Sequence, residues 1–411
     1  MPAAEAAPAA GSSVRRAETV ICGAGVTGLS LARELVARGA GDILVIEKEP
    51  EPGRHASGRN SGVLHAGIYY TPDSLKARFC QEGNRAMRAY CREHGLPLLE
   101  NGKVVVARDE SQLPTLEELH RRATACGARV QMIDERRLAE IEPAARSTRM
   151  ALHSLDTAVV DPRAILHCLH AELEATGKVR FCFNTRATGL EDDRTLATTA
   201  GPVRFSRLAN AAGAYADRLA RAFGLAGRYQ LVPFKGLYRR LTAERSDLVR
   251  GSIYPVPDIR NPFLGVHFTR GVSGRVYLGP TSIPALGREN YGVLAGLDAE
   301  CASILWRDAV LFLTNRKFRR IALTEPRKYL FKHFFADAAG LVQELSPEDI
   351  EPSSKVGIRP QLVDLRTGEL VMDFVIERTD TSVHVLNAIS PAFTGGFSFA
   401  RMVADELERS A

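Results

Sequence analysis

The 411-residue sequence has no long uncharged apolar run, although 45% of its residues are hydrophobic. A helix that crosses a membrane needs about 18 or more consecutive, mostly apolar residues. The sequence therefore predicts no transmembrane helix. Its composition, with 25% charged residues, is typical of a globular protein of two or three domains.

Closely spaced cysteine pairs are also missing. The seven cysteines are scattered, odd in number and without a C-x-x-C motif. This spacing favours neither a disulfide framework nor a zinc site, so we predict no bound metal. Because free cysteines persist in a reducing compartment, we expect a cytoplasmic protein.

A strong excess of charge of one sign is absent. Lys and Arg total 54 and Asp and Glu total 48, which gives a formal net charge of +6. A nucleic-acid-binding protein normally has a much denser basic surface, so we expect no nucleic-acid partner. The small positive charge suits a small anionic substrate and an anionic membrane surface equally well.

The first thirteen residues, MPAAEAAPAAGSS, lack the apolar core of a secretory signal and the arginines of a transit peptide. They are rich in alanine and proline. We therefore expect residues 1–17 to form a disordered tail.

From Glu18 the sequence predicts a strand, a glycine-rich turn, a helix and a second strand. Gly23, Gly25 and Gly28 spell G-x-G-x-x-G, in which bare glycines allow a pyrophosphate to approach the start of the helix. Glu47 ends the second strand, nineteen residues after Gly28, where a carboxylate binds the ribose of an adenosine. Together with the adjacent Lys48, these residues predict a dinucleotide site.

Strand and helix patterns alternate well beyond this unit. We expect helices over 73–95, 114–125 and 162–176, and strands over 103–107 and 179–183. Between 232 and 279, short β-type runs are broken by proline and glycine, and helical spacing returns over 297–335. The fold class is therefore α/β, a Rossmann-like domain with an inserted mixed or antiparallel-sheet domain.

A loop rich in glycine, serine and histidine follows the dinucleotide motif. Its composition favours FAD over NAD as the bound cofactor. The segment HASGRNSGVLHAGIYYTPDSLKARFC places small residues where a bulky ring system can lie against the chain. Its serine, asparagine and glycine residues are candidate cofactor ligands, and His65 is a candidate flavin contact or base. The candidate ligands are Ser57, Asn60, Ser61 and Gly62.

These segments, with VDPRAI, LVPFKGLY, IYPVPD, PFLGVHFTR, LGP and HVLNAISPAFT, resemble the FAD-dependent L-2-hydroxyglutarate dehydrogenase/oxidase family. This family lies within the D-amino-acid-oxidase-like superfamily, and the resemblance extends from about residue 18 to the C-terminus. It implies a discontinuous FAD-binding domain (18–95, 150–230 and 355–411). It also implies an inserted substrate-binding domain (96–149 and 231–354).

Three further segments match the superfamily. Gly213 and Asp217, in ANAAGAYADRLA, match a second FAD-supporting motif, although Asp217 is also an acid suited to a first helical turn. Arg359, in GIRP, is implied as a cofactor contact. The helix start at Thr394, Gly395 and Gly396 is suited to stabilising negative charge on a reduced flavin.

The resemblance implies hydride transfer from a 2-hydroxy acid, most specifically L-2-hydroxyglutarate, to flavin N5 while a base removes the hydroxyl proton. His65 and His267 are the candidate bases, since neutral histidine suits that role. Four residues are candidate carboxylate or substrate ligands: Tyr254, Arg270, Lys235 and Arg359.

Some positions depart from the family pattern. Leu237, in PFKGLY, stands where the family has an acid, and GIRP replaces G-V-R-A. An amino-acid or amine oxidase, another carboxylate substrate and a non-catalytic flavin protein are therefore alternatives.

The electron acceptor is oxygen, a quinone or a carrier protein. The basic amphipathic stretch 316–332 indicates either a solvated helical face or peripheral contact with a membrane.

Overall fold

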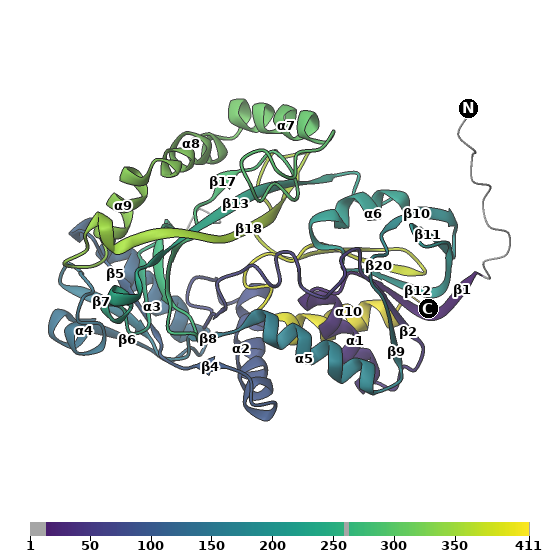
Figure 1. Ribbon diagram of the computed structural model, residues 1–411, viewed down its shortest axis with the longest axis horizontal. Helices are drawn as coiled ribbons and strands as arrows, with labels where there is room; N and C mark the ends of the chain where they lie inside the picture. The colour runs from purple at the N-terminus through teal and green to yellow at the C-terminus, as the bar shows by residue number, and fades with distance from the viewer. Residues whose placement is uncertain (1–13, 259–262, 411) are drawn as a thin grey trace, which may run out of the picture.

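The computed structural model describes residues 14–258 and 263–410. Most of the predicted tail, residues 1–13, lies outside this range, as does Pro262 of the PFLGVHFTR segment. Within the range, the tail prediction is wrong for Arg15 to Ala17, which belong to the first strand because they pair in parallel with Val203 to Phe205. Figure 1 shows two bodies side by side, each built around its own sheet.

The first sheet has eight strands and contains the predicted strand–helix–strand unit. Its central strands run in the order β12-β1-β2-β9 and are parallel, and β20 joins β12 in parallel as well. Antiparallel strands β10, β11 and β19 complete its edges. The strands are β1 (Arg15–Cys22), β2 (Ile43–Ile46), β9 (Val179–Cys182), β10 (Ala187–Asp192), β11 (Thr195–Thr198), β12 (Val203–Asn210), β19 (Val375–Arg378) and β20 (Ser382–Asn387).

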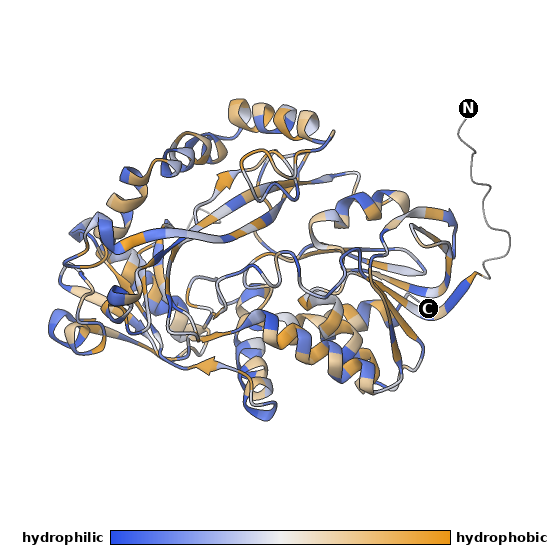
Figure 2. Ribbon diagram, in the orientation of Figure 1, coloured by the Kyte–Doolittle hydropathy of each residue, from blue (hydrophilic) through white to orange (hydrophobic). Residues whose placement is uncertain are grey.

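Three helices cover one face of this sheet, and a fourth, α2 (Leu75–Glu93), packs against α10: the three are α1 (Val26–Ala37), α5 (Pro162–Ala175) and α10 (Gly396–Glu408). Local signals explain their starts, because Ser74 accepts a hydrogen bond from the N–H of Ala77 and Asp161 accepts from those of Arg163 and Ala164. Apolar residues dominate the strands and the helices beneath them (Figure 2), and they form one buried core. The short helix α6 (Ala216–Ala222) contacts β10 and β20 instead.

The second sheet has nine mostly antiparallel strands in the order β17-β13-β16-β15-β14-β5-β7-β6, with β18 paired to β13. The long pair β13 and β18 places Phe234 opposite Arg359. The strands are β5 (Lys103–Val106), β6 (Val130–Asp134), β7 (Met150–Ser154), β13 (Tyr229–Leu241), β14 (Ser252–Pro255), β15 (His267–Arg270), β16 (Val276–Gly279), β17 (Ile283–Pro284) and β18 (Ile350–Asp364). A third, three-stranded sheet comprises β3 (Val63–Leu64), β4 (Leu98–Leu99) and β8 (Ala158–Val160).

The remaining helices belong to the second body. They are α3 (Leu113–Ala125), α4 (Glu135–Ile141), α7 (Cys301–Thr314), α8 (Arg316–Thr324) and α9 (Phe331–Ala339). Short 3-10 turns are η1 (Glu110–Gln112), η2 (Gly213–Tyr215), η3 (Ala243–Leu248), η4 (Glu325–Tyr329) and η5 (Pro347–Asp349). No helix in the described part of the chain has both the length and the apolarity to cross a bilayer.

The sheets divide the chain differently from the expected boundaries at 150 and 355. Strand β7 (Met150–Ser154) lies in the nine-stranded sheet because it pairs with β5 and β6. The second half of β18 remains in that sheet through its pairing with β13. The expected helices over 73–95, 114–125 and 162–176 are confirmed as α2, α3 and α5.

Candidate active site

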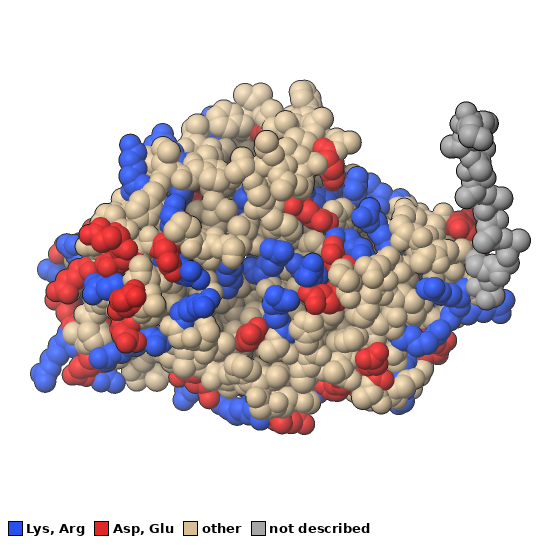
Figure 3. Space-filling model, in the orientation of Figure 1, with Lys and Arg blue, Asp and Glu red and all other residues tan. Residues whose placement is uncertain are grey.

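A cavity of about 820 Å³ extends from the glycine-rich turn to the nine-stranded sheet. Its lining comes from the ends of β1, β2 and β12, from the loop that follows β2, and from β13, β14, β15 and β18. The face in Figure 3 is hollowed near its centre, and basic side chains gather along the hollow. The cavity therefore joins the predicted dinucleotide site to the predicted substrate strands.

At the dinucleotide end, Gly23 and Gly25 line the cavity, and Gly28 lies behind them. A Cβ on Gly28 would lie 1.9 Å from the carbonyl oxygen of Gly23, so no other residue fits this turn. Glu47 also lines the cavity, and its carboxylate accepts the N–H groups of Ala24 at 2.8 Å and Glu49 at 3.0 Å. These contacts fix the acid beside the glycine-rich turn.

The serine- and histidine-containing loop is attached to this turn. Ser57 Oγ accepts the N–H of Val26, the first residue of α1, at 2.9 Å. Asn60 donates to the Ser57 carbonyl at 2.6 Å and accepts the N–H of Gly62 at 2.8 Å. Ser57, Asn60 and Ser61 line the cavity, whereas Gly62 shapes the loop from outside the lining.

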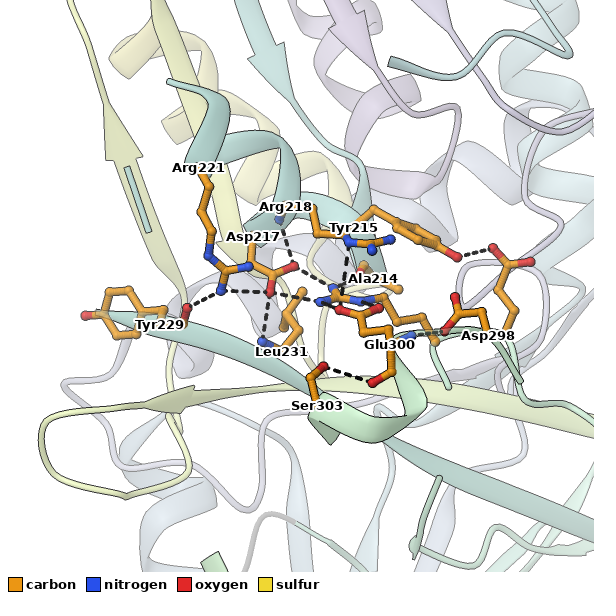
Figure 4. A network of polar contacts seen from close by, with 12 residues as sticks. Ala214, Tyr215, Asp217, Arg218, Arg221, Tyr229, Leu231, Asp298, Glu300 and Ser303 are labelled. Atoms are coloured by element: carbon orange, nitrogen blue, oxygen red, sulfur yellow. Dashed lines mark hydrogen bonds and ion pairs between the residues drawn. The ribbon is translucent and has the colours of Figure 1, made fainter. Parts of the chain in front are cut away.

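Gly213 lines the cavity, but Asp217 does not, and a cofactor contact of Asp217 stays a prediction. Its carboxylate is fully buried and binds Arg288 at 2.5 and 3.1 Å, and it also accepts the N–H of Leu231 at 3.1 Å. Figure 4 shows the contact of Asp217 with Leu231 and its ion pair with Arg221. Asp217 therefore anchors α6 to the segment around Arg288.

The segment 287–300 covers the same end of the cavity, because its Arg288 and Tyr291 belong to the lining. Lys48 pairs with Glu289 at 2.8 Å and with Glu49 at 2.5 Å. Tyr291 and His55 share a hydrogen bond of 2.7 Å. Glu49, His55 and Glu289 stand close enough to hold a cation, but the ammonium of Lys48 already lies among them.

At the other end, Thr394 lines the cavity just before α10, and Gly395 and Gly396 lie behind it. Thr394 Oγ1 accepts the N–H of His65 at 3.1 Å. The start of α10 is therefore linked directly to the candidate base. The positive end of the α10 dipole therefore lies next to a residue of the cavity lining.

His65 and His267 both line the cavity, where His267 is buried and His65 is partly buried. Burial lowers the pKa of His65 to about 3 and that of His267 to about 4, so both imidazoles are neutral at neutral pH. His267 Nδ1 donates to the Gly265 carbonyl at 2.8 Å, which leaves Nε2 unprotonated. Tyr254 stacks on this ring, with 3.8 Å between the centroids.

Arg359, like Tyr254, is a predicted substrate ligand that lines the cavity. Its guanidinium lies 4.8 Å from the ring centroid of Phe263, and desolvation lowers its pKa to about 10. At this pKa the guanidinium stays charged at neutral pH. A charged guanidinium in the cavity suits a carboxylate.

Lys235 and Arg270 do not line the cavity, and their role as substrate ligands stays a prediction. Lys235 lies between two lining residues of β13, and its side chain points to the other face, where it donates to the Gly292 carbonyl at 2.6 Å. Arg270 donates to the carbonyls of Ser246 and Val249 at 2.8 and 3.1 Å. Both charges hold loops in place.

The sequence analysis missed Lys103, Tyr69 and Tyr238. Tyr238 lines the cavity, and Lys103 and Tyr69 lie around Tyr254. Only the lysine carries a signal in the sequence, because it opens the apolar strand Lys103–Val106, where a charge is unexpected.

The glycine-rich turn, the fixed acid and the cavity that starts there fit an adenine dinucleotide, and two neutral imidazoles and an arginine line the same cavity. The family model described as FAD dependent oxidoreductase matches residues 18–406, and the chain belongs to this family.

Curated relatives support the assignment along almost the whole chain. An L-2-hydroxyglutarate dehydrogenase from Indibacter alkaliphilus is 34% identical and is matched over 94% of this chain and 98% of its own length. The Escherichia coli protein of the same name is 32% identical, with coverages of 95% and 92%. The human protein, named as mitochondrial, is 32% identical, with coverages of 95% and 89%.

Solved structures support the fold. L-α-glycerophosphate oxidase from Mycoplasma pneumoniae, with FAD bound, gives a TM-score of 0.74 at 22% identity and coverages of 96% and 95%. Glycine oxidase from Geobacillus kaustophilus gives 0.70 at 21% identity, with the same coverages. The predicted fold class and the FAD requirement are thereby confirmed.

Proposed function

We propose that the protein oxidises L-2-hydroxyglutarate to 2-oxoglutarate. The observation that carries the proposal is that an arginine, Arg359, and a neutral, oriented histidine, His267, line one cavity that begins at the dinucleotide turn. The relatives named L-2-hydroxyglutarate dehydrogenase support this choice of substrate.

Each residue has a distinct role in this proposal. Gly23, Gly25 and Glu47 would hold the ADP half of FAD, and Thr394 would contact its flavin; all four residues line the cavity. Bound FAD supplies the acceptor for the hydride that leaves the carbinol carbon. Arg359 binds the carboxylate next to that carbon.

His267 accepts the hydroxyl proton at Nε2, because its Nδ1–H is held by the Gly265 carbonyl. His65 lies on the flavin side, where Thr394 fixes its backbone. Burial of both rings excludes water from the proton transfer. An anionic substrate raises the basicity of a neighbouring imidazole, which offsets the effect of burial on its pKa.

A substrate panel tests the proposal. The FAD-loaded protein is supplied with L- and D-2-hydroxyglutarate, L-lactate, L-glutamate and sarcosine, with an artificial dye as electron acceptor, and keto-acid or imine products are measured. We expect 2-oxoglutarate from the L-hydroxy acid alone. Preferential oxidation of L-glutamate or sarcosine contradicts the proposal and assigns the site to amine oxidation.

We also propose that the helical ridge α7–α9 contacts an anionic bilayer. This ridge runs along one side of the molecule (Figure 1). It exposes both apolar and basic side chains, a combination suited to anionic lipid. The exposed apolar residues are Leu305, Trp306, Leu313, Leu323, Tyr329 and Leu330, and the exposed basic residues are Arg316, Lys317, Arg320, Arg327 and Lys332.

Trp306 reports on this contact, since it is the single tryptophan of the chain and is 69% exposed. Its emission should shift to shorter wavelength with phosphatidylglycerol vesicles and remain unchanged with phosphatidylcholine vesicles. The double variant Arg316→Glu/Arg320→Glu should weaken the shift. An unchanged spectrum with anionic vesicles at low salt contradicts the contact. A membrane location places the enzyme next to quinone as an electron acceptor.

A further inference from the structure

Lys103 is a buried lysine that the proposed chemistry does not use. It opens β5, and its side chain is 1% exposed. Its ammonium lies 4.6 Å from the ring centroid of Tyr69 and 4.7 Å from that of Tyr254. Among the described residues, its Nζ has no hydrogen-bond partner and no ion pair. A buried cation without a counter-charge is costly to keep.

In the described part of the chain, no carboxylate interacts with Lys103. The groups that interact electrostatically with it are the imidazoles of His65 and His267 and the thiol of Cys80. Burial keeps the imidazoles neutral and raises the pKa of the thiol, so none of them neutralises an ammonium. Among the described residues, the ammonium of Lys103 contacts the faces of two aromatic rings.

The ammonium of Lys103 is separated from the cavity by the ring of Tyr254. Tyr254 lines the cavity and stacks on His267, and it contacts Lys103 through the same ring system. Tyr69 adds a second buried hydroxyl, also without a partner in the described ranges. The charge of Lys103 and the hydroxyl of Tyr69 therefore lie close to the candidate base His267. Lys103 is on β5, whereas Arg359 is on β18.

We propose that Lys103 is a specificity-determining residue that stabilises a second carboxylate of the substrate, acting across the ring of Tyr254. Arg359 binds the carboxylate next to the reacting carbon, and Lys103 favours substrates with another carboxylate at the far end. This inference rests on the proposed function and adds to it a reason for choosing a dicarboxylic over a monocarboxylic 2-hydroxy acid. Because it acts through Tyr254, Lys103 is a positioning residue and not a catalytic one.

The variant Lys103→Met tests this role, since methionine keeps the length and removes the charge. Its kinetics with L-2-hydroxyglutarate are compared with those for L-2-hydroxyglutaramate, in which an amide replaces the distal carboxylate. We expect kcat/KM for the dicarboxylate to fall about tenfold or more, mainly through KM, while the value for the amide changes less than about threefold. Lys178→Met, at an exposed position, is the matched control for net charge.

Equal losses for both substrates, or no loss for either, overturn the proposal. Lys103→Gln provides a second variant if the methionine variant fails to fold, with bound FAD as the measure of folding. Binding separates this proposal from the proposed function: glutarate and its monoamide are titrated into each FAD-loaded variant, and the flavin spectrum is followed. In one outcome, the unsubstituted protein oxidises no hydroxy acid and yet binds glutarate more tightly than the monoamide, with this preference lost in Lys103→Met. That pair of results supports the inference about Lys103 and refutes the proposed substrate. Unchanged preference refutes the inference.

Discussion

Arg288 binds the carboxylate of Asp217 with two guanidinium nitrogens, although the two residues are 71 positions apart. The same guanidinium binds Glu300 at 2.7 and 2.8 Å, and it is only 3% exposed. This pair joins the segment 287–300 to α6 at the rim of the cavity. It gives that segment a fixed place over the dinucleotide end.

Removing the arginine should destabilise the protein, because Arg288→Met leaves the fully buried Asp217 without its main partner. We expect the free energy of unfolding to fall by about 3 to 5 kcal/mol, measured by urea denaturation. FAD should also dissociate faster from the variant. The double variant Arg288→Met/Asp217→Asn should lose less than the sum of the single losses. Additive losses contradict a direct coupling.

The glycine-rich turn gives a prediction with an internal control. Gly28→Ala places a Cβ against the Gly23 carbonyl, so it should open the turn and reduce the FAD bound after purification by at least about tenfold. Gly41→Ala adds the same methyl where no atom lies within 4 Å, and it should retain FAD. Flavin absorbance relative to protein measures both. Full occupancy in Gly28→Ala would show that the cofactor does not depend on this turn.

The base is tested by exchanging each histidine for an amide. His267→Asn removes the proton acceptor, and we expect the rate of flavin reduction to fall about 10² to 10⁴-fold, with substrate binding preserved. His65→Asn should lower the rate less, since its role is on the flavin side. Rapid-mixing absorbance under anaerobic conditions measures both rates. A larger loss for His65→Asn would exchange the two assignments.

Burial of Lys103 should lower the free energy of unfolding of the protein. The unfolded lysine holds its proton up to pH about 10.5, whereas burial lowers the pKa of Lys103 to about 7. Between these values the unfolded state binds more protons, so this group destabilises the fold most at low pH and least above pH 10.5. Lys103→Met should therefore raise the free energy of unfolding at pH 7 by on the order of 1 to 4 kcal/mol. A less stable variant contradicts this account of Lys103.

The dicarboxylate preference should also depend on pH. As Lys103 loses its proton above pH about 7, the KM for L-2-hydroxyglutarate should rise more steeply than that for its amide. His65, His267, Cys80, Tyr69 and Tyr254 surround the amine, but the pKa values of the imidazoles lie well below this range and those of the thiol and phenols above it. Parallel KM profiles for both substrates contradict the assignment.

The dinucleotide end was predictable from the sequence because each of its residues is close to the others along the chain. The turn from Gly23 to Gly28 and the acid at Glu47 lie within a single strand–helix–strand unit, and hydrophobic periodicity identifies its elements. The family resemblance supplied His65, His267 and Arg359.

The substrate end was harder to predict, because strand direction and tertiary pairing determine which side chains face the cavity. Lys235 and Arg270 are cations on strands that contribute to the cavity, but each points to the face that holds a loop. The sequence does not show which face a strand turns inward when both faces are partly buried. The role of Asp217 also depends on Arg288, a partner distant in sequence.

The most direct measurement is anaerobic titration of the FAD-loaded protein with the two enantiomers of 2-hydroxyglutarate, followed by absorbance at about 450 nm. The proposed site predicts full bleaching by the L enantiomer and none by the D enantiomer. A flavin that stays oxidised with L-2-hydroxyglutarate, or that is bleached instead by an amino acid, would contradict it.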